Sequence, residues 1–272
     1  MCLIARTSPA DWGITAFSTW SLAKLRDHLL ERGTVAAISR ETLRRILRGA
    51  GITWQTTTTW KASPDPDFIA KMQRILDLYD HPPADGRAIC VDEFGPLNLL
   101  PRKGMARRPQ TKPKRLRATY HRYDGVMQML AALDLVTGKL FYRIRPRKRA
   151  IEFLAFLKTC GRGGPARSCT SSATTTRRIA PHRNADVRAW CADNRIELVY
   201  LPTYGSWLNW IEAEFAALRY FALDGTDHRS HAEQNAAIGA YIRWRNARAE
   251  PKTGFVTDSP IRTWIHYPAK AA

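Results

Sequence analysis

The sequence predicts a mixed α/β fold preceded by a small helical unit, and two patterns support this. Apolar residues recur at helical spacing between 22 and 47. From residue 87 onward, short apolar runs typical of strands alternate with amphipathic helical patterns. The strand-like runs are 88–91, 126–133, 139–144 and 196–201. The helical patterns are 151–157, 187–191 and 207–223.

Breaks in these patterns predict how the chain is organised. Ser18 or Thr19 can cap a first helix and Ser39 a second one, whereas the polar, proline-containing stretch after 55 cannot continue a helix. The expected segments are a linker remnant at 1–17, a helix-turn-helix unit at 18–54, a linker and helix at 55–86, an α/β unit at 87–246 and a tail at 247–272.

The charge balance indicates a polyanionic partner. Lys and Arg total 43 against 24 acidic residues, which gives a net charge of +19 and a pI near 10.2. Double-stranded DNA is the leading candidate. A membrane surface is the rival, but no apolar run approaches the roughly 20 residues of a spanning helix. We therefore expect a soluble, cytoplasmic protein.

The second expected helix has a basic face suited to DNA. Its arginines can reach phosphates or guanine edges in a major groove. The alternative is a solvated basic face on an ordinary helical hairpin. The candidate residues are Arg40, Arg44, Arg45 and Arg48.

A second basic tract runs from 102 to 122, where nine Lys or Arg residues occur without any acid. Pro101, Pro109 and Pro113 prevent a helix, so we expect an exposed loop that contacts DNA phosphates. The alternative is a generic solvated loop. The basic residues are Arg102, Lys103, Arg107, Arg108, Lys112, Lys114, Arg115, Arg117 and Arg122.

Two carboxylates end apolar or aromatic stretches in the way that nucleases place metal ligands. Asp92 ends a buried strand-like run, and Glu212 follows Asn209-Trp210-Ile211. Carboxylates are the ligands that Mg²⁺ prefers, and DNA strand cleavage commonly uses two such ions. The alternatives are a turn residue for Asp92 and solvated helix residues for Glu212 and Glu214.

Together these residues resemble the transposases of bacterial insertion sequences related to the mariner superfamily. The motifs that carry the resemblance are Val-Asp-Glu-Phe-Gly at 91–95, Leu-Pro-Thr-Tyr-Gly-Ser-Trp-Leu-Asn-Trp-Ile-Glu at 201–212, Trp-Ser-Leu at 20–22, Trp-Lys-Ala-Ser-Pro-Asp-Pro-Asp at 60–67 and Tyr-Ile-Arg-Trp-Arg-Asn at 241–246.

The resemblance implies an RNase H-like domain with a five-stranded mixed sheet and an Asp, Asp, Glu triad. Helix-turn-helix modules of the family bind the element's terminal inverted repeats. Asp92 matches the first Asp and Glu212 the Glu, and both are expected to hold Mg²⁺ or Mn²⁺, two ions in an intact homologue. Glu214 is the less favoured ligand. Target DNA and a possible homodimer are the further partners that the family implies.

The segment between these carboxylates departs from the family pattern. Counting back from Glu212 by the family's spacing gives Arg177, and no Asp or Glu occurs from 153 to 185. The Gly, Ser and Thr content of 161–176 also predicts that the family's fourth strand is missing. Metal binding in this copy is therefore doubtful.

A compensated frameshift explains this departure. In a shifted reading frame, one choice of codons for 166–179 gives an apolar strand ending in Asp-Asn, with the Asp near Thr174. The family also carries another helix-turn-helix upstream, so we expect a truncated, defective transposase. Its rivals are a non-catalytic DNA-binding protein, such as a repressor of the element, and a generic nuclease or integrase of the same fold.

Overall fold

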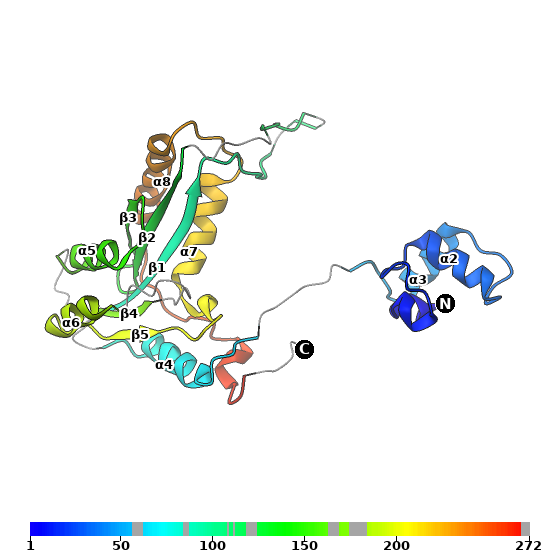
Figure 1. Cartoon of the computed structure of the whole chain (residues 1–272), viewed down its shortest axis with the longest axis horizontal. Helices are drawn as coiled ribbons and strands as arrows, with labels where there is room; N and C mark the ends of the chain where they lie inside the picture. Colours follow the sequence, from blue (N-terminus) through cyan, green and yellow to red (C-terminus); the bar gives the residue numbers. More distant parts are fainter. Residues whose placement is uncertain are drawn as a thin grey trace. The chain divides into compact units, whose positions relative to one another are not determined.

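The computed structural model divides into two compact units, Met1–Trp60 and Lys61–Ala272. The boundary falls inside the linker expected at 55–86. Each unit is described by itself (Figure 1). The structure describes residues 1–55, 62–83, 87–107, 109–110, 112–117, 124–162, 169–173 and 184–267.

The N-terminal unit is helical. Its elements are α1 (Cys2–Arg6), the 3-10 helix η1 (Pro9–Trp12), α2 (Leu22–Glu31) and α3 (Arg40–Gly49). The Ser21 hydroxyl accepts from the Lys24 amide, so Ser21 caps α2 in place of Ser18 or Thr19. Ser39 caps α3 as expected.

The structure differs from the linker expected over 1–17. Ile4 of α1 is buried against Leu25, Leu29 and Leu43 of α2 and α3. The Trp20 indole donates a hydrogen bond to the carbonyl of Thr7 at 3.0 Å. A five-residue helix is too short to produce a visible apolar period, yet its one buried side chain completes the small core.

The larger unit is built on one mixed sheet with the strand order β3-β2-β1-β4-β5. Strands β1, β2 and β3 are antiparallel, and β4 and β5 continue the sheet in parallel with β1. Their bounds are β1 (Arg87–Asn98), β2 (Val126–Asp134), β3 (Leu140–Arg145), β4 (Cys169–Ala173) and β5 (Leu198–Tyr200). The mixed α/β class is confirmed.

Strand β4 corrects the expectation that 161–176 contains no strand. Its backbone pairs with β1 from Arg87 opposite Cys169 to Val91 opposite Ala173, and with β5 on its other side. A strand with partners on both edges is stabilised by backbone hydrogen bonds, which do not require apolar side chains. Composition alone therefore missed it.

Helices cover both faces of the sheet (Figure 1). One face packs against α4 (Phe68–Asp80), α7 (Ile211–Leu218) and α8 (His231–Asn246), and the other against α5 (Ala150–Arg162) and α6 (Ala185–Asp193). Three shorter helical elements complete this unit. They are the 3-10 helices η3 (Ser206–Leu208) and η5 (Pro260–Thr263) and the π-helix η4 (Arg219–Leu223), which extends α7. Even-numbered β1 residues such as Cys90 and Phe94 face α7.

The segment after α8 is packed rather than a free tail, at least through residue 267, where the described part ends. Phe255 and Ile261 are buried in the core beside α4 and α7. The Lys252 amide donates to the Leu135 carbonyl at 2.8 Å. At Gly138, with φ +64°, an added Cβ would collide with the Glu250 backbone, so this turn requires glycine.

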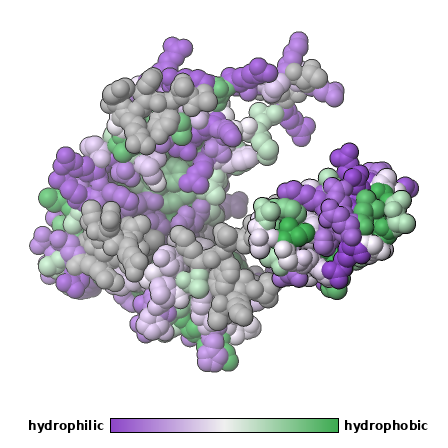
Figure 2. All heavy atoms as spheres, turned by 45° about the vertical axis from the view of Figure 1, so that its right-hand side comes forward, coloured by the Kyte–Doolittle hydropathy of each residue, from purple (hydrophilic) through white to green (hydrophobic). Residues whose placement is uncertain are grey.

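Hydrophilic side chains dominate much of the described surface in Figure 2, with smaller hydrophobic patches on both units. The N-terminal unit also contains an open cavity of about 490 Å³, lined by residues that include Trp20, Leu25, Leu47, Arg48 and Trp54. Among the described residues, no helix is long and apolar enough to cross a membrane.

Candidate active site

Asp92 lies in the middle of β1, on the sheet face that packs against α7. It is nearly buried, with 8% of its surface exposed. Its Oδ1 accepts from the Glu93 amide at 2.7 Å, and its Oδ2 accepts from the Asn209 side-chain amide at 3.2 Å. The carboxylate is therefore held in one orientation from two sides.

Asn209 joins this strand to the start of α7. Its buried side chain donates to the Val91 carbonyl at 3.2 Å as well as to Asp92. Its own carbonyl accepts from the Glu212 amide at 3.0 Å. The same residue thus contacts both candidate metal ligands, one through its side chain and one through its backbone.

Aromatic packing fixes α7 along β1. The rings of Phe94 and Phe215 are 5.1 Å apart. Phe94 lies two residues after Asp92 in β1, and Phe215 lies three residues after Glu212 in α7. Behind them, the Tyr79 hydroxyl donates to the Leu208 carbonyl at 3.0 Å. Because both chain segments are held in register, the first turn of α7 lies at the level of Asp92.

Glu212 is half-buried in this first turn. Burial raises the pKa of its carboxyl above the usual value, and a hydrogen bond from Ser206 and the positive charge of Arg219 partly offset this effect. A carboxyl that is costly to ionise in isolation is stabilised when a cation binds beside it. In the described part of the chain, the charge of Arg219 acts on Glu212 in this direction.

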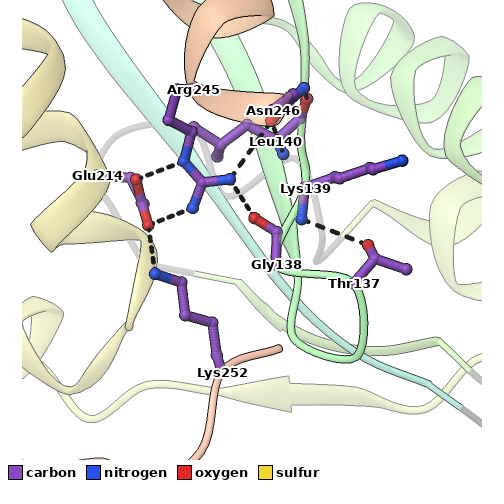
Figure 3. A network of polar contacts seen from close by, with 8 residues as sticks. All are labelled: Thr137, Gly138, Lys139, Leu140, Glu214, Arg245, Asn246 and Lys252. Carbon is purple, nitrogen blue, oxygen red and sulfur yellow. Dashed lines mark hydrogen bonds and ion pairs between the residues drawn. The ribbon is translucent and has the colours of Figure 1, made fainter. Parts of the chain in front are cut away.

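Glu214, the other acid of this turn, is already paired (Figure 3). Arg245 donates to it from Nε at 2.9 Å and from Nη2 at 2.5 Å, and the Lys252 ammonium lies 3.0 Å away. Burial alone would raise the pKa of Glu214, but the hydrogen bonds from these two cations lower it. Arg245 also donates to the Gly138 carbonyl, so Glu214 is a structural anchor between α7, α8 and the β2–β3 turn.

A third carboxylate is absent from the described part of this site. No cluster of three His, Cys, Asp or Glu side chains suited to a metal occurs among the described residues. The β4 register ends with Val91 opposite Ala173, and the next residues in sequence are Asp92 and Thr174. Thr174 and Arg177 both lie outside the described residues. The described residues therefore do not supply the ligands of a two-ion site.

The basic loop is anchored to the connection between η4 and α8. The Arg102 amide donates to the Thr226 carbonyl at 3.0 Å, and the Lys114 ammonium donates to the Gly225 carbonyl at 3.1 Å. Arg117 forms an ion pair with Asp227 at 3.1 Å. Burial lowers the pKa of half-buried Arg102, and the charge of Arg219 adds to this effect.

The remaining described cations of this loop are exposed and have no ion pair within the described chain. They are Lys103, Arg107, Lys112 and Arg115. Arg108 lies outside the described residues, as does Arg122. Some of the residues predicted to contact DNA, such as Arg117, therefore have partners within the protein, whereas others are available to bind phosphates.

The arginines of α3 are divided in the same way. Arg44 forms an ion pair with Glu41 at 2.6 Å, and the hydrogen bond between them raises the pKa of Arg44. Arg44 and Arg48 line the open cavity of the N-terminal unit. Arg40 and Arg45 are exposed. Of the four candidates, Arg45 faces away from the buried Leu43 and Leu47.

Comparison with known proteins shows which family this chain resembles. A family model described as "DDE superfamily endonuclease" matches residues 87–234. The 39 kDa protein of insertion element IS630 from Shigella sonnei is 26% identical over 216 residues, which make up 79% of this chain and 61% of that protein. The chain thus spans less than two thirds of that relative.

The fold is similar to that of solved Mos1 transposase structures. A Mos1 paired-end complex with the left transposon end has a TM-score of 0.56 at 14% identity and covers 83% of this chain and 72% of that one. A mariner Mos1 paired-end complex with Mg has the same TM-score at 13% identity and the same coverage. Because the family model covers more than half of the sequence, the chain belongs to the DDE superfamily endonuclease family. The expected resemblance to insertion-sequence transposases related to mariner is confirmed by the similarity to the IS630 protein and to the Mos1 fold.

Proposed function

We propose that this chain is an insertion-element transposase that still binds DNA but cannot complete the metal-dependent reaction. The observation that carries the proposal is the contact of Asn209 with Asp92, which brings the helix bearing Glu212 to β1. This arrangement supports an RNase H-like site. In an intact relative, a second Asp would join these two carboxylates.

The missing ligand is the reason for the proposed defect. The residues from 153 to 185 contain no Asp or Glu. If one followed β4 at position 174, it would come directly after the residue paired with Val91. We propose that Asp92 and Glu212 hold a Mg²⁺ or Mn²⁺ ion weakly here. Metal ions in the complete site would activate the nucleophile and the leaving oxygen for strand cleavage and strand transfer.

DNA binding is proposed for the parts of the chain that retain free cations. The capped helices α2 and α3 support a helix-turn-helix unit that recognises terminal inverted repeats through α3. The basic loop at 102–117 would bind phosphates of the element end or the target DNA. The solved Mos1 relatives are paired-end complexes, so a homodimer of this chain on two ends is part of the proposal.

The second candidate is a non-catalytic DNA-binding protein that represses its own element. The absence of an acid between 153 and 185 favours it. It shares with the first proposal the affinity for element ends and the absence of cleavage by the unaltered chain. It differs in predicting that an Asp restored after β4 would not produce cleavage.

The test is to incubate the chain with end-labelled duplexes that carry the element's end or a scrambled sequence, with Mg²⁺ or with Mn²⁺. We expect tighter binding to the element's end and no nicks in either metal. Equal, weak binding to both duplexes would contradict transposase-type end recognition. Cutting without subsequent joining to a second DNA would instead indicate a simple nuclease.

A further inference from the structure

Strand β3 forms an edge of the sheet and carries an exposed row of arginines. Among the strands that the structure describes, β2 alone pairs with it. Arg143 and Arg145 are exposed, and Arg147 follows two residues beyond the end of β3. Alternate residues of a strand point to the same face, so Arg143 and Arg145 lie side by side on the face of β3 opposite Tyr142 and Ile144.

The other face of β3 is occupied. Tyr142 and Ile144 pack against the core on the α8 side. At the start of the strand, the Asn246 side chain donates to the Leu140 carbonyl at 2.8 Å and accepts from the Leu140 amide at 2.9 Å. These contacts fix the strand and leave the arginine face directed to solvent.

Arg143 and Arg145 each use few of their N–H donors in hydrogen bonds within the described chain. Nη1 of Arg143 donates to the Tyr142 carbonyl, and Nη1 of Arg145 donates to the Ile144 carbonyl, both at 3.2 Å. A guanidinium has five N–H donors, so most remain available in each case. The contacts orient the side chains along the edge of the sheet.

The nearby acids are already paired with other cations. Lys148 forms an ion pair with Glu93 at 2.6 Å, and Arg149 forms one with Glu152 at the same distance. By contrast, Arg143, Arg145 and Arg147 make no ion pair with any described residue. The row is therefore a patch of positive charge that nothing in the described chain neutralises.

Spacing favours a polyphosphate as the ligand. Residues two apart on a strand are separated by about 6.6 Å. Successive phosphates on one DNA strand rise by about 3.4 Å and also turn about the helix axis, so the distance between neighbouring phosphates exceeds this rise and is comparable to the arginine spacing. Guanidinium groups pair with phosphate oxygens through two parallel hydrogen bonds.

We propose that Arg143, Arg145 and Arg147 form a phosphate-binding stripe for the backbone of duplex DNA, separate from α3 and the basic loop. This inference rests on the proposed function in that it takes DNA as the partner. In the sheet, Arg143 of β3 lies opposite Leu130 of β2, and Leu130 lies opposite Glu93 of β1. Arg143 and Glu93 are therefore two strand spacings apart, or about 10 Å, on the face opposite Asp92. The stripe therefore holds DNA independently of the candidate metal site and reads no sequence.

A structural explanation competes with this proposal. Charged residues on an edge strand prevent edge-to-edge aggregation, whatever their sign. The double substitution Arg143→Glu with Arg145→Glu separates the two roles, because it keeps the edge charged and reverses the sign that a phosphate requires. Lys158→Glu with Arg188→Glu is the matched control, since both residues are exposed on α5 and α6 and the change in net charge is equal.

The experiment measures binding of the full chain to an element-end duplex and to an unrelated duplex by fluorescence anisotropy at several salt concentrations. Loss of two phosphate contacts lowers the slope of log K against log salt by about 1.8. We expect at least tenfold weaker binding of the stripe variant to both duplexes, with an unchanged preference between them. The control variant should keep the slope of the unaltered chain. Circular dichroism and size-exclusion chromatography verify that both variants are folded.

Equal behaviour of the stripe variant and the control would overturn the stripe and assign these arginines to edge protection. In that case Arg143→Thr with Arg145→Thr should aggregate while the Glu variant stays soluble. Failure of the unaltered chain to bind any DNA would overturn the proposed function as well. If the unaltered chain binds DNA and the Arg143→Glu, Arg145→Glu variant binds equally well, the stripe is overturned but the proposed function is not.

Discussion

The side-chain amide of Asn209 donates a hydrogen bond of 3.2 Å to Asp92, across 117 residues of sequence. A second hydrogen bond from the same amide reaches the Val91 carbonyl. Asn209 directly precedes Trp210 and α7, so these two contacts bring Glu212 to the middle of β1. The candidate site therefore depends on a buried polar residue that is not itself an acid.

Replacing Asn209 with Leu should destabilise the larger unit, because the buried oxygens of Asp92 and Val91 each lose a donor. Leaving a buried acceptor unsatisfied costs about 1–3 kcal/mol. Urea unfolding followed by tryptophan fluorescence measures the change. Gln110→Ala, at an exposed position of the basic loop, is the control and should change the free energy of unfolding by less than about 0.5 kcal/mol. An equally small effect at Asn209 would show that the contact does not anchor α7.

The Glu214 network should contribute far more stability than a surface ion pair. Glu214→Gln leaves Arg245 and Lys252 without their buried counter-charge, which costs about 3–5 kcal/mol. The control is Glu197→Gln, which breaks the exposed pair with Arg74 and should cost at most about 1 kcal/mol. Similar losses for both variants would contradict a buried anchor.

The same network predicts a pH dependence. The pKa of Glu214 is lower in the folded protein than its ordinary value of 4.5. The stability that its carboxylate contributes is therefore present above pH 4.5 and is lost as the pH falls through the lowered pKa. The difference in unfolding free energy between the unaltered chain and Glu214→Gln should shrink below pH 4.5. A difference that stays constant to low pH would rule out this linkage.

Cations of the basic loop should differ in their effect on DNA binding. Arg115→Ala should lower the slope of log K against log salt by about 0.9, because Arg115 is available to a phosphate. Arg117→Ala should lower it less, since Arg117 already pairs with Asp227. Salt titrations of duplex binding test this order. The reverse order would mean that DNA displaces Asp227 and that Arg117 is the principal contact.

Sequence recognition should depend on Arg45 of α3. A side chain that contacts a base edge contributes roughly 1–3 kcal/mol of specificity. Arg45→Ala should therefore reduce the preference for the element's end over scrambled DNA, whereas Arg44→Ala should have a smaller effect because Arg44 pairs with Glu41. Competition binding with the two duplexes measures the preference. Equal losses of affinity on both DNAs would reduce Arg45 to a phosphate contact.

Local patterns in the sequence were sufficient to predict several parts of the fold. Apolar period and turn residues indicated α2, α3, the β2–β3 hairpin and a helix at 207–223, which the structure divides into η3, α7 and η4. Strand β4 was missed because its sequence, Cys-Thr-Ser-Ser-Ala, contains no apolar run, and its backbone pairs with strands that lie far away in the sequence. Helix α1 was missed because it is only five residues long.

The sequence proposes Asp92 and Glu212 as metal ligands from their positions after apolar stretches, and this assignment stays a prediction. Strand β1 continues past Asp92 to Asn98, so Asp92 does not end the strand as expected. The contact of Asn209 with Asp92 could not be predicted, because it joins residues far apart in sequence. The engagement of Glu214 by Lys252 was equally hidden, because 247–272 has no periodic pattern and was expected to be a tail. Such contacts between distant side chains leave no local signal.

The central claim is that the proposed metal-dependent reaction fails because the chain lacks a carboxylate after β4. The most direct measurement is Mg²⁺-dependent nicking of an element-end duplex by two proteins, the unaltered chain and a variant in which 166–179 is replaced by the shifted-frame translation with its Asp. We expect no cleavage by the first and cleavage by the second, abolished by Asp92→Asn or Glu212→Gln. Robust Mg²⁺-dependent cleavage by the unaltered chain would contradict the account.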